Sequence, residues 1–206
     1  MKLTKATELS YENTGEKVEQ ILLGAMQEFL LRGFAGTSME KVATAAGVSK
    51  PTVYSYFKDK EALFQALIEN LAKKKFNSIY DSGLLDGEPK IVLRNLAAKT
   101  LQHFDEDQEF DDFMRVVIGE SGRFPELAKL CVRNIFKPIL EVVSKYIASH
   151  PELEISDCEA AALTFIGTLA HYHISQHILH GKDVMPMEQE RMVDTLMDLM
   201  LKSTHI

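Results

Sequence analysis

Apolar residues recur along this chain three and four positions apart, which is the spacing of one face of an α-helix. The first clear stripe contains Val18, Ile21, Leu22 and Ala25, and Gly33 is expected to end its helix. No segment alternates as a β-strand does, so the sequence predicts an all-α fold. Helices are expected over residues 15–33, 37–47, 49–57, 59–80, 90–104, 110–120, 125–149, 156–181 and 186–202.

Two of the shortest predicted helices are joined by a tight turn. Thr37 with Glu40 three residues later has the form of a capping box, which starts a helix. Gly47 lies where a left-handed residue would end that helix, and Ser49 is expected to cap the next one through the amide of Thr52. Two short helices around a turn with glycine have the form of a helix-turn-helix, whose second helix enters the major groove of DNA.

The second of these helices has a polar outer face, while Val53 and Phe57 can face the core. Asp59 is expected to cap the helix that follows, which places Lys60 in its first turn. A lysine there opposes the helix dipole, and a phosphate outside the helix would relieve the conflict. The outward residues are Lys50, Thr52, Tyr54, Ser55 and Tyr56.

The residues carry more than spacing. The runs ILLGAMQEFLLRGFAGTS and AGVSKPTVYSYFKDKEALF, residues 21–38 and 46–64, resemble the signature of TetR-type bacterial transcriptional regulators. Pro51 replaces a frequent glycine of that signature, and Tyr56 replaces a frequent histidine. The resemblance implies that this segment binds an operator in double-stranded DNA. The DNA-facing positions that it implies are Thr37, Ser38, Ser49, Lys50, Pro51, Thr52, Tyr54, Tyr56 and Lys60.

The chain is expected to divide into a flexible arm at residues 1–14, a DNA-binding domain at 15–60 and a helical ligand-binding and dimerisation domain at 61–206. The helix over 59–80 would be the only covalent route between the two domains. The segment ESGRFPEL, residues 120–127, resembles the AefR-like type of C-terminal domain in the same family. Pro138 predicts a kink within the helix over 125–149.

The last two predicted helices are apolar almost all round. Phe165 and Leu169 on the first, with Leu196 and Met200 on the second, leave little solvent face. One face can be buried within the subunit, and the other needs a partner. A homodimer through these two helices is therefore expected, as the family resemblance also implies. The alternative is that both helices are central in a monomer.

A net charge of −7 opposes nucleic-acid binding for the chain as a whole, but the charge is unevenly divided. Residues 1–60 hold eight basic and seven acidic residues, whereas the remainder holds fifteen and twenty-three. The sequence shows no membrane-spanning run and no signal peptide, so a cytoplasmic location is expected. Cys131 and Cys158 are expected to be buried free thiols. No cofactor is expected.

The run HYHISQHILH contains the only spacing that suggests a metal site. His173 and His177 are one helical turn apart, but no second group of ligands is visible, so no metal is predicted. A helical enzyme such as a metal-dependent hydrolase is an alternative that would need paired acid and base groups, and none can be assembled. A dimerisation module that does not bind DNA is the other alternative, although it would not need the polar face of residues 50–56.

The expected function is a transcriptional regulator, most simply a repressor, that binds a palindromic operator and is released by a small-molecule effector. The effector should be largely apolar with one or two polar groups, which Tyr172 or His171 could meet. The alternative for each apolar residue is that it only fills the core. The candidate ligand-binding residues are Phe104, Phe113, Met114, Val117, Ile135, Phe165, Leu169, His171 and Tyr172.

Overall fold

In the computed structural model the first helix is the longest. The described backbone covers residues 5–80 and 85–201, with side chains for residues 15–74 and 85–201. Helix α1 (Lys5–Gly36) leaves helical geometry at Gly33, whose φ is 67°, so the predicted break at this glycine is confirmed. The predicted start at Gly15 was wrong, because α1 already begins at Lys5. No proline lies between these residues to stop a helix from extending.

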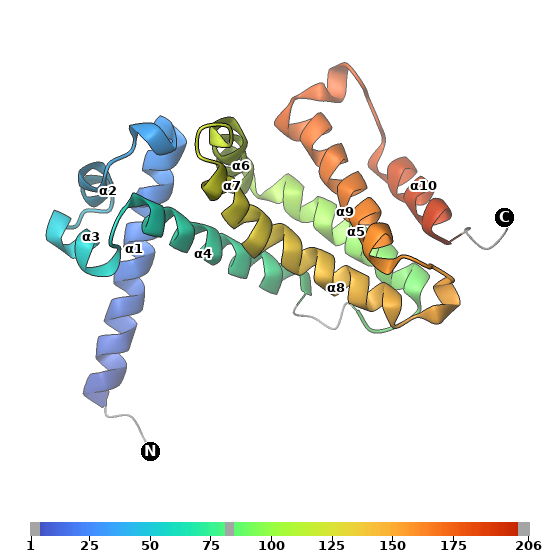
Figure 1. Ribbon diagram of the computed structural model, residues 1–206, viewed down its shortest axis with the longest axis horizontal. Coiled ribbons are helices and arrows are strands. Elements are labelled where there is room, and N and C mark those ends of the chain that lie inside the picture. Colours follow the sequence, from blue (N-terminus) through green and yellow to red (C-terminus); the bar gives the residue numbers. More distant parts are fainter. Residues whose placement is uncertain (1–4, 81–84, 202–206) are drawn as a thin grey trace. The chain divides into compact units, whose positions relative to one another are not determined.

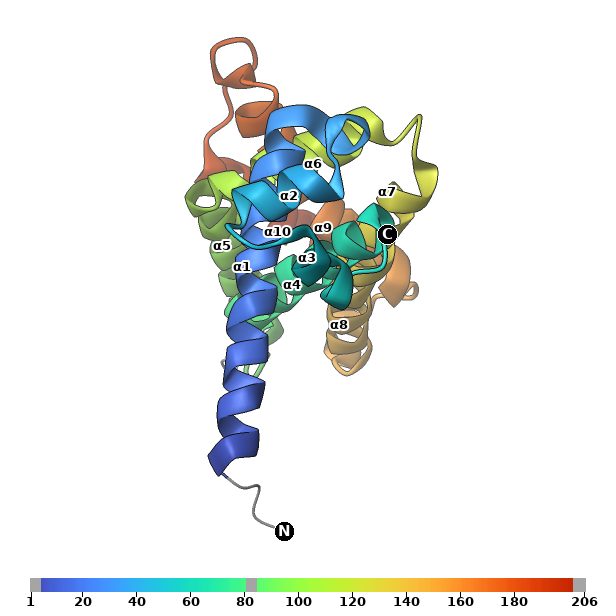
Figure 2. The ribbon, with the colours of Figure 1, turned by 90° about the vertical axis from the view of Figure 1, so that its left-hand side faces the viewer.

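The predicted turn between two short helices is present. Helix α2 (Met39–Ala45) is followed by Gly47 with a φ of 63°. The Gly47 amide donates to Thr44 O and the Val48 amide to Ala43 O, which is a Schellman ending. Helix α3 (Lys50–Tyr56) then begins, and α2 and α3 lie beside the C-terminal half of α1, whose other half extends beyond them (Figures 1 and 2).

Helix α2 approaches α1 closely at one glycine. A Cβ atom at Gly24 would lie 2.6 Å from the Ala46 backbone nitrogen, well inside van der Waals contact. One turn earlier on α1, the Gln20 side-chain amide donates to Ala46 O at 2.7 Å. The end of α2 is therefore held against α1 by a hydrogen bond at a place where only glycine leaves room.

The capping box at Thr37 was predicted wrongly. The cap of α2 is Ser38, whose Oγ accepts from the Lys41 amide at 3.4 Å. Thr37 is buried and its hydroxyl lies 2.8 Å from Gly33 O and 3.0 Å from Glu28 O. The broken end of α1 leaves carbonyl groups that need donors, and the Thr37 hydroxyl serves them instead of starting α2.

Helix α4 (Lys60–Tyr80) begins at its predicted cap, since the Ala62 amide donates to Asp59 Oδ1 at 2.8 Å. Phe64 of α4 packs edge-on against Phe29 and Phe34, at centroid distances of 5.0 and 5.4 Å. Two further rings join from later in the chain: Phe113 lies 5.2 Å from Phe64 and Phe124 lies 4.9 Å from Phe34. This aromatic cluster explains why the helix-turn-helix and the later residues Phe113 and Phe124 form one unit.

The chain forms two compact units. The first unit contains the residues up to Leu71 together with Asp112–Cys131, and the second contains Ala72–Asp111 and the residues from Val132 onward. The first unit thus extends past the predicted boundary at residue 60. Helix α6 (Gln108–Glu120) crosses between the units, as α4 does. The sequence analysis expected a single connecting helix, whereas the chain passes between these two units in α6 as well as in α4.

The second unit is built around α5 (Pro89–Glu106), α8 (Lys137–Ala148), α9 (Cys158–His173) and α10 (Gln189–Leu201). Their buried residues form one core, which includes Leu93, Val143, Phe165 and Leu196. Short 3₁₀ turns, Pro151–Leu153 and Gly181–Asp183, precede and follow α9. Asp157 caps α9 by accepting from the Ala160 amide at 3.0 Å, near the predicted start of this helix at residue 156.

Two π-helical segments interrupt the helices of the second unit. Helix α7 (Pro125–Cys131) in the first unit continues into η1 (Val132–Phe136) and then α8. Pro138 has no amide for the carbonyl of Asn134, and the π segment directly before it accommodates this loss where a kink was predicted. Segment η3 (Ile174–Ile178) continues α9 in the same way.

The described residues are helical or lie in turns, which confirms the all-α prediction for that part of the chain. Within the same residues, none of the helices combines the length and the apolar character needed to cross a membrane. Between the helices predicted over residues 59–80 and 90–104, residues 81–84 lie outside the described part.

Candidate nucleic-acid interface and apolar cavity

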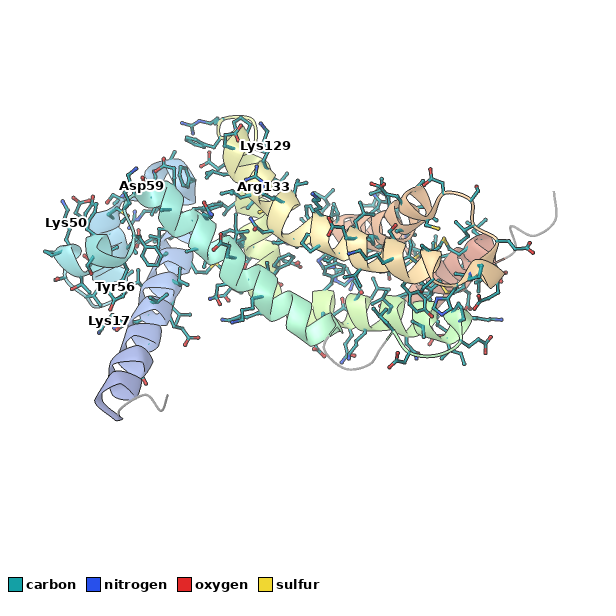
Figure 3. The ribbon with its side chains drawn as sticks, turned by 60° about the horizontal axis from the view of Figure 1, so that its bottom comes forward. Lys17, Lys50, Tyr56, Asp59, Lys129 and Arg133 are labelled. Carbon is teal, nitrogen blue, oxygen red and sulfur yellow. The ribbon has the colours of Figure 1, made fainter. Side chains whose placement is uncertain are left out.

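The outer face of α3 carries the polar side chains that the sequence predicted. Tyr54 is 45% exposed, and Lys50, Pro51 and Ser55 are also exposed, whereas Val53 is fully buried. Tyr56 and Thr52 are half-buried. Lys50 and Tyr56 mark the two ends of this helix (Figure 3). Helix α3 therefore rests on the core through one face and presents a polar and aromatic face outward.

The first turn of α3 is fixed by its cap. Ser49 Oγ accepts from the Thr52 amide at 3.2 Å and lies 2.7 Å from Thr52 Oγ1, so the predicted cap is confirmed. Lys50 forms an ion pair with Glu40 of α2, and its ammonium lies 5.8 Å from the centroid of the Tyr54 ring. The hydrogen bond to Lys50 lowers the pKa of the Glu40 carboxyl, and the same bond raises the pKa of Lys50. Lys50 therefore stays charged beside Tyr54.

Lys60 is occupied within the protein. Its ammonium donates to Phe34 O at 2.7 Å and to Thr37 O at 3.1 Å, and it lies 4.3 Å from the Phe34 ring centroid. The sequence predicted that a phosphate would offset the unfavourable position of Lys60 in the first turn of α4. Two main-chain carbonyl groups and an aromatic face do this instead. The Thr37 side chain is buried, so its hydroxyl also faces inward, while Ser38 is half-exposed at the start of α2.

Lys17 is a further candidate residue for the nucleic-acid interface, and it was not among the predicted DNA-facing positions. Its ammonium donates to Gln20 Oε1 at 3.0 Å, and Gln20 in turn reaches Ala46 O beside the turn between α2 and α3. Figure 3 shows Lys17 on α1. The sequence pattern of α1 identified its apolar stripe. It did not show that the half-buried Lys17 lies one helical turn from Gln20, the residue that contacts the helix-turn-helix.

The second unit contains an apolar cavity of about 80 Å³. Thr100 supplies the only hydroxyl group among its lining residues. Ile135 and Phe136 belong to the π segment η1, so an irregular helix forms part of the wall. The lining residues are Leu96, Thr100, Phe104, Phe110, Ile135, Phe136, Ile139, Val143, Phe165, Ile166, Leu169 and Ala170.

Four of the predicted ligand-binding residues line this cavity: Phe104, Ile135, Phe165 and Leu169. Others lie elsewhere, because helical spacing shows which residues are buried but not in which core. Phe113, Met114 and Val117 are buried in the first unit. His171 and Tyr172 line a separate, more open hollow with Thr164, Ser175 and Met192, and Tyr172 donates to Met187 O at 3.0 Å.

A polar cluster adjoins the cavity. His173 Nε2 donates to Asp111 Oδ1 at 2.7 Å, and both side chains are at most 6% exposed. The ring of Phe104, which lines the cavity, is stacked on His173 with centroids 4.3 Å apart. His177 Nδ1 lies 3.2 Å from Asp105 Oδ1, and burial lowers the pKa of His177. Asp105 and Asp111 were not among the predicted site residues, because nothing in the sequence indicates that these acidic residues lie beside the histidines.

The outer face of α9 is apolar and uncovered in the single chain. Leu163 is 60% exposed, and Ala160, Thr164 and Gly167 on the same face are also exposed. On α10, Leu199 is 70% exposed. The opposite faces of these helices are buried in the core through Phe165 and Leu196, as the sequence pattern predicted. Cys131 is buried and its pKa is raised to about 12 by desolvation, whereas Cys158 is half-buried and not fully buried as predicted.

Both parts of the chain match known families. Residues 21–67 match the family described as bacterial regulatory proteins, tetR family, and residues 92–203 match the AefR-like transcriptional repressor, C-terminal domain. An uncharacterized HTH-type transcriptional regulator of Bacillus subtilis, YhgD, is 37% identical over 66% of this chain and 68% of its own length. The match to YerO of Bacillus subtilis, at 31% identity, covers 46% of this chain and 34% of that protein.

Solved structures give the same result for the fold. The flavonoid-responsive regulator FrrA is 28% identical, with a TM-score of 0.74 over 92% of this chain and 97% of that one. A TetR-family regulator from Mesorhizobium loti has the same TM-score at 26% identity, covering 91% of this chain and 96% of that one.

Proposed function

Because this chain belongs to the TetR family of transcriptional regulators, we propose that it is a homodimeric repressor of transcription. Helix α3 of each copy reads one half of a near-palindromic operator, and a largely apolar small molecule bound in the second unit releases the DNA. The family consists of DNA-binding regulators and not of enzymes, so the alternative of a helical hydrolase is set aside.

The observation that carries this proposal is the outward face of α3. A helix of seven residues that is capped by Ser49 and anchored by the fully buried Val53 is held rigidly. Its exposed side chains, Lys50 and Tyr54, supply a cation and an aromatic ring with a hydroxyl, which suit phosphate and base-edge contacts. A module used only for dimerisation would have no need of this face.

The outer face of α9 and the exposed Leu199 of α10, whose other exposed residues are polar, support the homodimer. Leu163 and Leu199 expose most of their surface, and exposed apolar patches of this kind commonly mark protein interfaces. Pairing α9 and α10 with the same helices of a second copy would bury both leucines in an isologous interface. Two copies related by a two-fold axis then explain why the operator should be palindromic.

The cavity supports an apolar effector. Its lining offers one hydroxyl, from Thr100, among carbon-rich side chains. The volume of about 80 Å³ is below the roughly 300 Å³ at which ligand pockets usually begin. A drug-sized effector therefore has to displace side chains of the wall, and the free energy of that displacement is what couples the effector to the rest of the protein. The predicted polar contacts through His171 or Tyr172 are replaced by Thr100, because the two former residues line the other hollow.

Selection of bound duplexes from a random DNA pool tests the proposal. A recovered near-palindrome supports a dimeric reader, and recovery of no preferred sequence contradicts it. Lys50→Ala and Tyr54→Ala should then weaken binding to the selected operator more than to random DNA, by about 1–3 kcal/mol for a side chain that contacts a base. Leu31→Ala is the matched control, because Leu31 is exposed on α1 and lies outside the predicted DNA-facing positions.

Effector action has its own test. An effector that releases the operator must bind operator-bound protein more weakly than free protein, by the same factor. Unequal factors, or a tight cavity ligand that leaves operator affinity unchanged, would refute release through the cavity while leaving the DNA-binding proposal intact. The variant for this test is Phe165→Ala, which enlarges the cavity. Its control is Thr168→Ala, on the same helix but outside the cavity.

A further inference from the structure

Three side chains with metal-binding atoms converge in the second unit. One ring nitrogen of His173, one of His177 and a carboxylate oxygen of Asp105 all lie within 4.8 Å of one another. The two histidines are one turn apart where α9 passes into η3, and Asp105 comes from the last turn of α5. We infer that Asp105, His173 and His177 form a binding site for a divalent transition-metal ion, with Zn²⁺ as the ion that the donors fit best.

The distances suit such an ion. Bonds of 2.0–2.2 Å in tetrahedral geometry place neighbouring ligand atoms roughly 3.3 Å apart. His177 Nδ1 and Asp105 Oδ1 are already separated by 3.2 Å. The rings of His173 and His177 lie face to face, with centroids 5.0 Å apart and planes inclined by 24°. The three donor atoms lie within 4.8 Å of one another, so binding one ion shortens their longest separation by at most roughly 1.5 Å, which rotation of the Asp105 and His177 side chains would supply.

His173 has the surroundings of a metal ligand. Histidines that bind metals almost always donate their other ring N–H to a carboxylate or carbonyl, which fixes the tautomer and orients the ring. The hydrogen bond from His173 Nε2 to Asp111 Oδ1, 2.7 Å long and buried, does this and leaves Nδ1 as the ring nitrogen that would bind the ion. The ring is also held between Phe104, at 4.3 Å, and His177. Its position is thus fixed before an ion arrives.

The donor set selects among ions. Two imidazoles and one carboxylate suit Zn²⁺, Co²⁺ or Ni²⁺, whereas Ca²⁺ and Mg²⁺ prefer oxygen ligands alone. Three protein ligands leave one position of a tetrahedral ion for water or for an oxygen of a small molecule. Because Phe104 both contacts His173 and lines the cavity, the ion would lie beside the cavity wall.

Titration of the chelator-treated full chain with Co²⁺ tests the site, since Co²⁺ in a tetrahedral site of nitrogen and oxygen donors absorbs visible light much more strongly than hydrated Co²⁺. One ion per chain is expected, and Zn²⁺ should displace it because Zn²⁺ suits the same donors. His177→Ala and Asp105→Asn should each weaken binding at least about 10-fold, and Asp111→Asn, which perturbs only the orienting hydrogen bond, should do so by about 10- to 100-fold. Both of the first two variants keep the buried His173–Asp111 bond, and circular dichroism checks that they are folded.

The matched control is His171→Ala, which removes an exposed imidazole from the same helix. It should bind Co²⁺ as the unaltered chain does. The inference is overturned if Co²⁺ produces no visible absorption with one ion per chain, if His177→Ala binds as tightly as the unaltered chain, or if His171→Ala loses as much affinity as His177→Ala. Operator binding is not needed for any of these measurements, so failure of the regulatory proposal would not affect the result.

Discussion

Lys60 and Phe34 are joined twice: the Lys60 ammonium donates to the Phe34 carbonyl oxygen at 2.7 Å and lies 4.3 Å from the centroid of the Phe34 ring. The first turn of α4 is thereby tied to the end of α1. This pairing assigns Lys60 a structural role in the first unit, although the family resemblance placed it among the DNA-facing residues.

Replacing Lys60 should therefore affect stability more than DNA binding. Lys60→Ala removes two hydrogen bonds from a charged donor and a cation–π contact, and the free energy of unfolding should fall by about 1–3 kcal/mol. The dependence of non-specific DNA binding on salt should be unchanged in slope. Urea unfolding and fluorescence anisotropy at several salt concentrations measure the two effects. Lys58→Ala, at an exposed neighbouring lysine, is the control for charge, and a slope shallower by about one in Lys60→Ala would restore the phosphate contact.

Glu40 should restrain DNA binding. Its carboxylate pairs with Lys50 on the outward face of the helix-turn-helix, so it both occupies that lysine and repels phosphate. Glu40→Gln should raise non-specific affinity at low salt and steepen the salt slope by about one per half-site, because Lys50 becomes available to a phosphate. Glu159→Gln removes the same charge from an exposed position in the second unit and should change neither. Weaker binding in Glu40→Gln would mean that the ion pair positions Lys50 for DNA.

The proposed homodimer can be tested at residues that the subunit core does not need. Phe165 and Leu196, which the apolar pattern singled out, are 1% and 3% exposed, so a charge there would unfold the chain whatever its assembly. Leu163→Asp places the charge on the outer face of α9 instead. Folded monomers are expected in sedimentation experiments at micromolar concentration, with Leu31→Asp remaining dimeric as a control for an exposed leucine elsewhere. A Leu163→Asp dimer as stable as the unaltered one would exclude this face.

Gly24 should tolerate no side chain. Its Cβ would lie 2.6 Å from the Ala46 nitrogen, so α1 and α2 would have to separate. Gly24→Ala should lower the free energy of unfolding by about 1–3 kcal/mol through overpacking and should weaken operator binding as α2 shifts. Gly119→Ala in α6 meets no atom within 4 Å and should be neutral or stabilising by up to about 1 kcal/mol. Equal thermal midpoints for the two variants would show that the contact relaxes without cost.

Local signals predicted the helix ends well. Gly47, Ser49 and Asp59 act as their sequence context indicated, because a cap is decided by residues two to four positions away. Thr37 was misassigned because its hydroxyl partners belong to the end of α1, which only the packed structure brings back to it.

The candidate sites also differ in whether neighbouring or distant residues decide them. The outward residues of α3 follow from one helical period, and in the structure Lys50, Tyr54 and Ser55 are exposed while Thr52 and Tyr56 are half-buried. The cavity and the histidine cluster depend on residues distant in sequence: Asp111 and His173 are 62 positions apart, and nothing in either segment shows that they pair. Phe113, Met114 and Val117 were expected near a ligand because their stripe is apolar, but an apolar stripe does not reveal which core it enters.

The backbone passes between the two compact units at residues 71–72, 111–112 and 131–132. A fragment that stops at Leu71 would keep the helix-turn-helix but lose Phe113 and Phe124, leaving Phe64 and Phe34 without two of their aromatic neighbours. We therefore expect that the helix-turn-helix does not fold stably as an isolated N-terminal fragment. Gene fusions or truncations that retain only the first 71 residues should yield aggregation-prone chains, and an autonomous version would have to carry residues 112–131 as a grafted hairpin or supply substitutes for both rings.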